Sequence, residues 1–214
     1  MASILKGSLG LLGGTFDPPH NAHLAVAEAA WRQFELKRVV FVPNGVPPGK
    51  RISNGVTSED RYRMTRLAVA GHRHFSVSRI EIDRDGPSYT IDTIRAMKDD
   101  CPEGVCFILG ADQMAEIETW REPEALLNSV SILVAPRAGV SLAFLAKSPF
   151  AAASIHVLEM GEVDLSSTGV RDRVAHGESI EEWVPRSVAR YIEDHGLYRV
   201  GAWVGSHGTG GQDR

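Results

Sequence analysis

Short apolar runs alternate with longer amphipathic segments along most of the chain. Continuous apolar runs rich in β-branched and aromatic residues predict buried strands. The predicted strands are residues 9–12, 38–42, 105–109, 130–134 and 155–158. A strictly alternating run at 75–82 predicts one more strand, with Arg79 and Glu81 on its solvated side. Apolar positions three and four residues apart predict helices at 24–34, 59–70, 87–99 and 185–195, with a further helix beginning near 166–168.

This order of elements is typical of an α/β protein. Helices between consecutive strands favour right-handed βαβ units and a parallel sheet. We therefore predict a single Rossmann-like domain over residues 1–200, in which a mostly parallel sheet carries helices on both faces. Residues 201–214 are glycine-rich, and we predict that they form a disordered tail.

The segment 13–24, GGTFDPPHNAHL, follows the first predicted strand directly. Gly13 and Gly14 allow the backbone to approach a ligand closely, and free N–H groups at a strand-to-helix turn favour an anion, most often a phosphate. With Asn21 as N-cap, His20 and His23 lie three residues apart on one side of the opening helical turn. Each feature alone is typical of a tight turn or a helix cap. Their combination after a buried strand favours a phosphate site.

A second candidate anion site lies in the segment 164–177, DLSSTGVRDRVAHG. Ser166, Ser167 and Thr168 are all suitable N-caps, and Arg171 lies one helical turn after Ser167. A hydroxyl, the free amides of a helix start and a guanidinium can converge there on one anion. Taken alone, the same pattern is also typical of an ordinary helix cap followed by a surface arginine.

Composition narrows the function further. A chain of 214 residues with 43% hydrophobic and 23% charged residues is an ordinary globular protein. Its net charge of −4 argues against broad nucleic-acid binding but allows a small nucleotide in a locally positive cleft. The chain has no membrane-length apolar run and no signal-peptide layout, so we predict a cytoplasmic location and no membrane partner. Cys101 and Cys106 match no metal-ligand spacing, which predicts no protein metal site.

The long loop at 43–58 contains a glycine- and lysine-bearing fragment, residues 45–50, that superficially resembles a P-loop. It is one residue short and carries Arg51 where Ser or Thr is needed, so we reject that interpretation. Loops of this length are often binding loops, which makes Lys50 a candidate ligand contact.

Two motifs carry a family resemblance. Residues 13–24 resemble the H-x-G-H signature region of the nucleotidyltransferase superfamily, in the form found in bacterial nicotinate-mononucleotide adenylyltransferases, and LSSTGVR at 165–171 resembles their I-S-S-T-x-x-R motif. The resemblance runs from about residue 10 to 200. Ala22 departs from the motif's usual glycine, and Gly49 stands where the family commonly has a histidine.

The resemblance implies a nucleotidyltransferase domain at 1–200 that transfers AMP from ATP to nicotinate mononucleotide, giving nicotinate adenine dinucleotide (deamido-NAD) and pyrophosphate in NAD biosynthesis. It implies Mg²⁺ bound mainly by the oxygens of ATP. The implied catalytic residues are His20, His23 and Arg171. The implied ATP contacts are Gly13, Gly14, Thr15, Phe16, His20, His23, Gly110, Asp112, Ser167, Thr168 and Arg171. The implied contacts to the acceptor mononucleotide are Asn44, Lys50, Thr90, Trp120 and Arg137.

Two alternatives stay open. The acceptor could be another phosphate compound, such as phosphopantetheine, although Trp120 and the segment SYTIDT at 88–93 speak against it. The chain could also be a non-catalytic nucleotide-binding regulator, for which Ala22 is the best argument. Whether the protein is a monomer or a homo-oligomer is not determined by the sequence.

Overall fold

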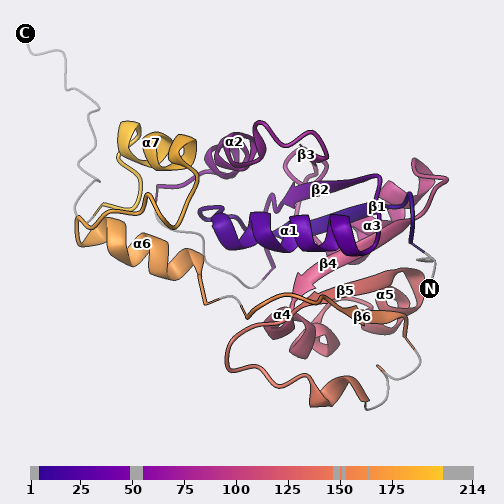
Figure 1. The fold of residues 1–214 in the computed structure, drawn as a ribbon. Coiled ribbons are helices and arrows are strands. Elements are labelled where there is room, and N and C mark those ends of the chain that lie inside the picture. The colour runs from indigo at the N-terminus through magenta and orange to yellow at the C-terminus, as the bar shows by residue number, and fades with distance from the viewer. Residues whose placement is uncertain (1–4, 49–54, 147–149, 151–152, 163, 200–214) are drawn as a thin grey trace, which may run out of the picture.

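A single parallel sheet organises the molecule (Figure 1). The computed structural model describes residues 5–48, 55–146, 150, 153–162 and 164–199. The elements in chain order are β1 (Leu9–Gly14), α1 (Asn21–Gln33), β2 (Arg38–Pro43), α2 (Ser58–Val69), β3 (Phe75–Val77), α3 (Thr90–Asp99), β4 (Val105–Gly110), α4 (Ala111–Ala115), η1 (Ile117–Thr119), α5 (Pro123–Ser129), β5 (Ser131–Ala135), η2 (Ala143–Ala146), β6 (Ile155–Val157), α6 (Ser167–Ala175) and α7 (Arg186–Asp194).

The strand order is β3-β2-β1-β4-β5-β6, and every pair of neighbouring strands is parallel. The chain runs outward from β1 to β2 and β3 on one side, then returns to place β4 on the other side of β1. Parallel α/β sheets bind ligands outside the carboxyl ends of the strands, at the point where the strand order reverses. Here that point lies between β1 and β4.

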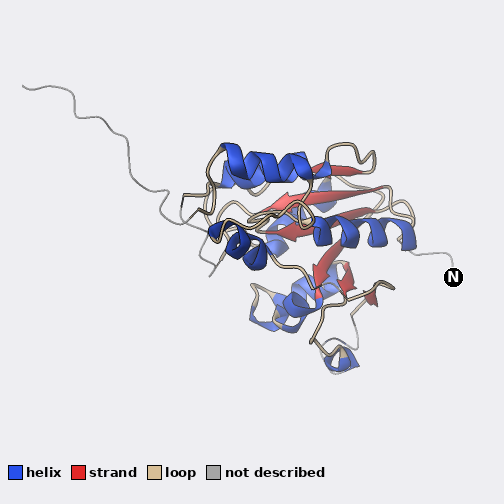
Figure 2. Ribbon diagram, turned by 60° about the vertical axis from the view of Figure 1, so that its left-hand side comes forward, coloured by secondary structure: helices blue, strands red, loops and turns tan. Residues whose placement is uncertain are grey.

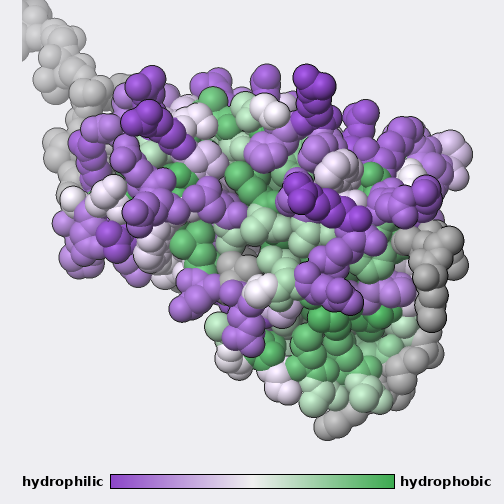
Figure 3. All heavy atoms as spheres, in the orientation of Figure 1, coloured by the Kyte–Doolittle hydropathy of each residue, from purple (hydrophilic) through white to green (hydrophobic). Residues whose placement is uncertain are grey.

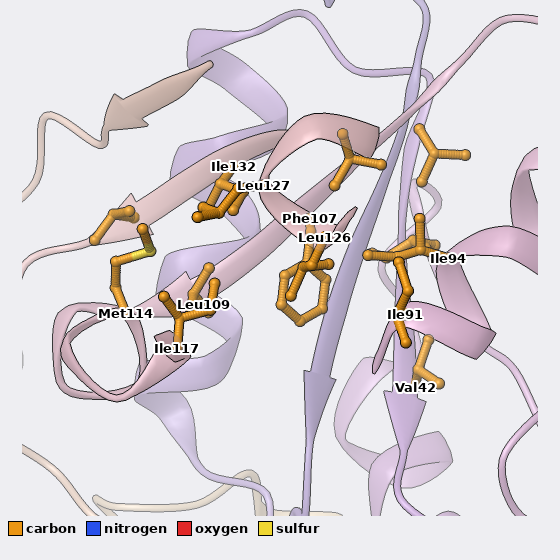
Figure 4. Close-up of a cluster of buried hydrophobic side chains, with 14 of the residues drawn as sticks. Val42, Ile91, Ile94, Phe107, Leu109, Met114, Ile117, Leu126, Leu127 and Ile132 are labelled. Carbon is orange, nitrogen blue, oxygen red and sulfur yellow. The ribbon is translucent and has the colours of Figure 1, made fainter. Parts of the chain in front are cut away.

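Helices cover both faces of the sheet, as Figure 2 shows. Because side chains alternate along a strand, neighbouring residues enter different cores. Leu11 and Phe107 face one core, which contains Ile91 and Ile94 of α3, and Figure 4 shows part of this cluster with its contributions from β4, α4 and α5. Leu12 faces the other core, together with residues of the neighbouring strands, and this core packs against α1. The prediction of an α/β sheet with helices on both faces is confirmed.

A third apolar cluster joins α2, α6 and α7. Met64 of α2, Val170 of α6 and Val188 of α7 are fully buried within it. This packing brings the C-terminal helices back to the amino-terminal half of the molecule. It places the start of α6 beside the loop between β1 and α1, although the two segments are far apart in the sequence.

The alternating run at 75–82 is not one strand. β3 ends at Val77, and the Ser78 N–H donates the last bond to β2, to the Phe41 carbonyl. The Ser78 Oγ then accepts the Ile80 N–H and turns the chain. Arg79 stays partly exposed as predicted, but Glu81 is buried and not on a solvated side. The alternation of apolar and polar residues at 75–82 therefore comes from a short strand followed by a turn that directs Ile80 to the core.

Helix starts also differ from the predictions. α1 begins at Asn21, so His20, and not Asn21, is its N-cap. Among the three candidates for α6, the cap is Ser166, whose Oγ accepts the Gly169 N–H at 3.1 Å. The helix predicted at 87–99 begins at Thr90, because Ser88 binds the loop after β2 instead of capping the helix.

Polar and apolar side chains are unevenly distributed over the face in Figure 3. Hydrophilic residues cover most of the region of α2, α6 and α7, hydrophilic and apolar residues are mixed over α1, and hydrophobic residues gather in the region of β6. Within the described part of the chain, no helix has the length and apolar character needed to cross a membrane.

Candidate active site

Two cavities lie side by side at the carboxyl ends of the central strands. The first has a volume of about 430 Å³ and the second about 530 Å³. Both are lined by Gly13, Gly14 and Gln113, which form a shared wall. A ligand in one cavity would therefore lie next to a ligand in the other, with little more than glycine backbone at the boundary.

The first cavity is where the two sequence motifs meet. Ala22, the departure from the histidine motif, also lines it. The structure brings together here every residue that the resemblance implied for ATP: Gly13, Gly14, Thr15, Phe16, His20, His23, Gly110, Asp112, Ser167, Thr168 and Arg171.

His20 and His23 form a stacked pair in this cavity, with their ring centroids 3.7 Å apart. The backbone N–H of His20 donates to Nδ1 of His23 at 3.1 Å. Because Nδ1 accepts in this geometry, the proton of neutral His23 lies on Nε2. Phe16 packs its ring edge-on against His23, with centroids 4.9 Å apart. The pair is therefore held in a fixed orientation.

Both imidazoles are neutral near pH 7. Burial, followed by the charge of Arg137, lowers the pKa of His20 from its ordinary value of 6.5 to about 4. Burial, then His20 and Arg137, also lowers the pKa of His23 well below that value. Nδ1 of His20 is buried and has no hydrogen-bond partner among the described residues. Because an unpaired buried polar atom is costly, this nitrogen is a candidate ligand contact.

The start of α6 is tied to the loop between β1 and α1. Ser167 Oγ donates to the Pro18 carbonyl at 2.8 Å, and Arg171 Nη1 donates to the Asp17 carbonyl at 2.7 Å. Arg171 Nη2 donates to Thr168 Oγ1 at 3.0 Å. Arg171 therefore uses part of its planar fork to hold the loop that carries the histidines.

Arg137 lines the first cavity and not the second. It follows β5, whose last residue, Ala135, pairs with Gly110 at the end of β4. This register brings Arg137 Nη1 to 3.5 Å from Asp112 Oδ2. The sequence could not predict this position, because it depends on strand order.

The second cavity brings together three of the residues implied for the acceptor: Asn44, Thr90 and Trp120. The Trp120 and Phe107 rings pack in a T-shaped arrangement, with centroids 6.3 Å apart. Lys50, and the departure at Gly49, lie outside the described residues. An aromatic surface with a polar rim suits a small aromatic ligand.

Glu81 is a residue of the second cavity that the sequence analysis placed elsewhere. Its carboxylate accepts the Asn44 Nδ2 at 2.7 Å and the Thr93 Oγ1 at 2.6 Å. Arg84 Nη1 donates to Thr93 Oγ1 at 2.9 Å, and Thr15 Oγ1 donates to Asn44 Oδ1 at 3.5 Å. Glu81 therefore fixes which way the Asn44 amide points. No linear signal marks such a carboxylate, because its burial comes from the turn after β3.

Two further residues that shape the cavities, Ser88 and Gln113, were not predicted from the sequence. Ser88 Oγ accepts the N–H groups of Gly45 and Val46, at 3.0 and 3.3 Å, and so holds the loop after β2. Gln113 lines both cavities.

Among the described residues, no group of three or more His, Cys, Asp or Glu side chains is placed to hold a metal ion.

The arrangement suits a transfer reaction between two bound molecules. The first cavity offers N–H donors and two guanidinium groups, which favour a chain of phosphates. The second offers a tryptophan together with neutral polar groups and the charged side chains of Glu81, Glu116 and Arg121. Donors and cations of this kind act by positioning bound anions and stabilising charge.

Comparison with known proteins agrees with this geometry. The cytidylyltransferase-like family model matches residues 11–173. A Moorella thermoacetica protein named "Probable nicotinate-nucleotide adenylyltransferase" is 42% identical over 200 residues, covering 90% of this chain and 92% of its own length. A Thermus thermophilus protein of the same name is 43% identical over 192 residues, covering 89% of this chain and 99% of its own length.

The fold also resembles solved structures. The nicotinic acid mononucleotide adenylyltransferase of Plasmodium falciparum complexed with NaAD gives a TM-score of 0.75 at 18% identity, covering 89% of this chain and 97% of its own. The same enzyme complexed with APC gives a TM-score of 0.74 at 17% identity, covering 90% and 97%. At such identity the likeness concerns the fold alone.

Proposed function

This chain belongs to the cytidylyltransferase-like family, and we propose that it transfers the AMP moiety of ATP to nicotinate mononucleotide. The products are nicotinate adenine dinucleotide and pyrophosphate. One observation carries the proposal: two cavities, one suited to phosphates and one to a small aromatic group, share the wall formed by Gly13, Gly14 and Gln113. The names of the relatives support the choice of substrates.

ATP occupies the first cavity in this proposal. His20 and His23 donate N–H groups to its phosphates beside the backbone amides near Thr15, and Arg171 approaches from α6. Neutral imidazoles are suited to this task, because each keeps one N–H that can donate to a phosphate oxygen although burial holds the ring uncharged. Arg137, which borders the same cavity, adds a positive charge next to the triphosphate and is therefore reassigned from the acceptor to ATP.

The reaction is a direct in-line displacement at the α-phosphorus. An oxygen of the acceptor's phosphate forms the new bond to that phosphorus, and the bond to the bridging oxygen of the β-phosphate breaks, so that pyrophosphate leaves. The acceptor phosphate has a second pKa near 6 and is largely dianionic at pH 7, which removes the need for a general base. The protein's task is to bring two anions together and stabilise the transferred group.

Magnesium fits this site as a companion of ATP. With no cluster of ligating side chains among the described residues, Mg²⁺ would be held mainly by phosphate oxygens and would neutralise part of their charge.

Nicotinate mononucleotide occupies the second cavity. Trp120 stacks on the pyridine ring, while Asn44 and Thr90 offer polar contacts at its rim. The orientation of Asn44 is set by Glu81. Four predictions from the sequence stay predictions: a contact from Lys50, the domain boundary at residue 200, the disordered tail and the cytoplasmic location.

The direct test is pyrophosphate release from Mg-ATP with nicotinate mononucleotide, nicotinamide mononucleotide and phosphopantetheine offered separately. Strong preference for the first supports the proposal. Release with only another acceptor would keep the chemistry and overturn the substrate. ATP binding without release in all three assays would favour a nucleotide-binding regulator.

A further inference from the structure

Arg61, in the first turn of α2, is a fully buried charged side chain. Burying a cation is costly, and replacing a buried ionic group by an apolar one often leaves stability unchanged or improves it. Nε of Arg61 is also buried without a hydrogen-bond partner among the described residues. Stability alone therefore does not explain an arginine at this position.

The guanidinium of Arg61 joins the two loops that border the cavities. Nη1 donates to the Thr15 carbonyl at 2.8 Å, in the loop after β1, and Nη2 donates to the Gly45 carbonyl at 2.9 Å, in the loop after β2. Thr15 lines the first cavity, and Asn44, next to Gly45, lines the second. One rigid fork thus sets the spacing between the backbones on either side of the shared wall.

The charges around Arg61 match this bridging position. Burial lowers the pKa of its guanidinium, and the negative charges of Asp17 and Glu81 counteract that effect. An arginine keeps its charge under these conditions. Asp17 belongs to the loop after β1, and Glu81 holds Asn44 in the loop after β2. The positive charge of Arg61 is therefore balanced by Asp17 at the first cavity and by Glu81 at the second.

The Gly45 side of the bridge has no spare room. A Cβ at this position would lie 2.1 Å from the Glu81 carbonyl oxygen. Ser88 Oγ also accepts the Gly45 N–H at 3.0 Å. The loop after β2 is thus confined between the Glu81 backbone, Ser88 and the guanidinium, so a shorter or more flexible cation at position 61 would change where this loop rests.

We propose that Arg61 is a positioning residue that sets the distance between the ATP site and the acceptor site. This inference rests on the proposed function. A positioning residue of this kind acts on whatever spans both cavities. A change at Arg61 should weaken binding of the transition state and of the dinucleotide product, because both contact the two loops at once. ATP or nicotinate mononucleotide alone contacts only one of the loops, so its binding should change little. A misplacement of about 1 Å between reacting groups can cost about 10²-fold in rate.

The test replaces Arg61 by lysine, which keeps the charge and loses the fork. We expect kcat to fall by about 10- to 100-fold. We also expect the dissociation constant of nicotinate adenine dinucleotide to rise by about 10-fold, because a bridging ligand depends on the spacing of its two subsites. The dissociation constants of ATP and of nicotinate mononucleotide, each measured alone by calorimetry, should change by less than about twofold.

Two control variants separate positioning from stability. Arg66→Lys makes the same exchange at an exposed site of the same helix and should change none of these values. Met64→Ala removes a fully buried side chain of α2, and should lower the melting temperature without a selective loss of dinucleotide affinity. If Arg61→Lys does not fold, Arg61→Met is the second variant, because it removes both carbonyl contacts together with the buried charge and should give the same selective loss.

The outcomes distinguish this inference from the proposed function. A wild-type protein without turnover and without dinucleotide binding would refute the proposed function. An active wild-type protein, together with a variant that keeps kcat and dinucleotide affinity or loses all three affinities equally, would overturn the positioning role of Arg61.

Discussion

Replacing His20 by glutamine should make the stability of the protein less sensitive to acid. In the folded protein, burial and Arg137 lower the pKa of this imidazole from 6.5 to about 4. The unfolded chain therefore binds more protons than the folded one between these two values. Stability contributed by neutral His20 is present above pH 6.5 and is lost as the pH falls towards 4.

The size of the effect follows from the same two pKa values. Between pH 7 and pH 5, proton binding to His20 in the unfolded state should remove about 2 kcal/mol from the free energy of unfolding. Glutamine cannot take up this proton. The His20→Gln variant should therefore lose about 2 kcal/mol less than the wild-type protein over that range. His23 is present in both proteins, so its own titration contributes to both.

The assay is urea unfolding at pH 7, 6 and 5, with the free energy extrapolated for each protein. His176→Gln, at an exposed position on the C-terminal side of α6, controls for the loss of an imidazole. Parallel losses of stability in wild type and His20→Gln between pH 7 and pH 5 would refute the conclusion that His20 is held neutral by burial.

Other predictions concern catalysis. His20→Ala should lower kcat by about 10²- to 10³-fold, as for the loss of one preorganised donor, with an unchanged circular dichroism spectrum; a near-normal rate would exclude His20 from the mechanism. Arg171→Lys should lower kcat/KM for ATP, because a lysine cannot bind the Asp17 carbonyl and a phosphate with one planar fork, and steady-state kinetics equal to wild type would leave Arg171 with a capping role only. Trp120→Ala should raise KM for nicotinate mononucleotide by about 10-fold or more through lost stacking, whereas an equal rise in KM for ATP would contradict its place in the second cavity. Glu81→Gln should raise the same acceptor KM, because the Asn44 amide loses its carboxylate partner; a pyrophosphate-release assay that shows no change would mean that the orientation of Asn44 is irrelevant to binding.

The features that were predictable from the sequence are those encoded in a short stretch. The apolar runs that became β1 and β4 are long enough to identify strands without knowledge of their partners. The histidines of the first motif lie three residues apart on one helical turn, so their proximity needs no tertiary information. Arg171 lies far from these histidines in the sequence, but its position in the same site could be predicted, because the family resemblance includes both motifs.

The features that escaped prediction depend on contacts between distant segments. Glu81 sits in an alternating pattern that normally marks a solvated strand face, yet a turn after β3 directs it to Asn44 and Thr93. Arg137 reaches the first cavity only because β5 pairs with β4. Arg61 reads as a polar position of an amphipathic helix, and only the arrangement of two loops around it explains its burial.

The shared wall of glycine backbone divides the site into two halves with separate structural origins. The histidines, Arg171 and the loop after β1 shape the half on one side, whereas the loop after β2, α3 and Trp120 shape the other. Selection can therefore remodel side chains of one half while the other stays intact, as long as Arg61 continues to join the two loops. An ancestral protein of this architecture could acquire a new acceptor by changes in the second half alone, and a designer could follow the same route by grafting acceptor loops onto an unchanged adenylyl-donor platform.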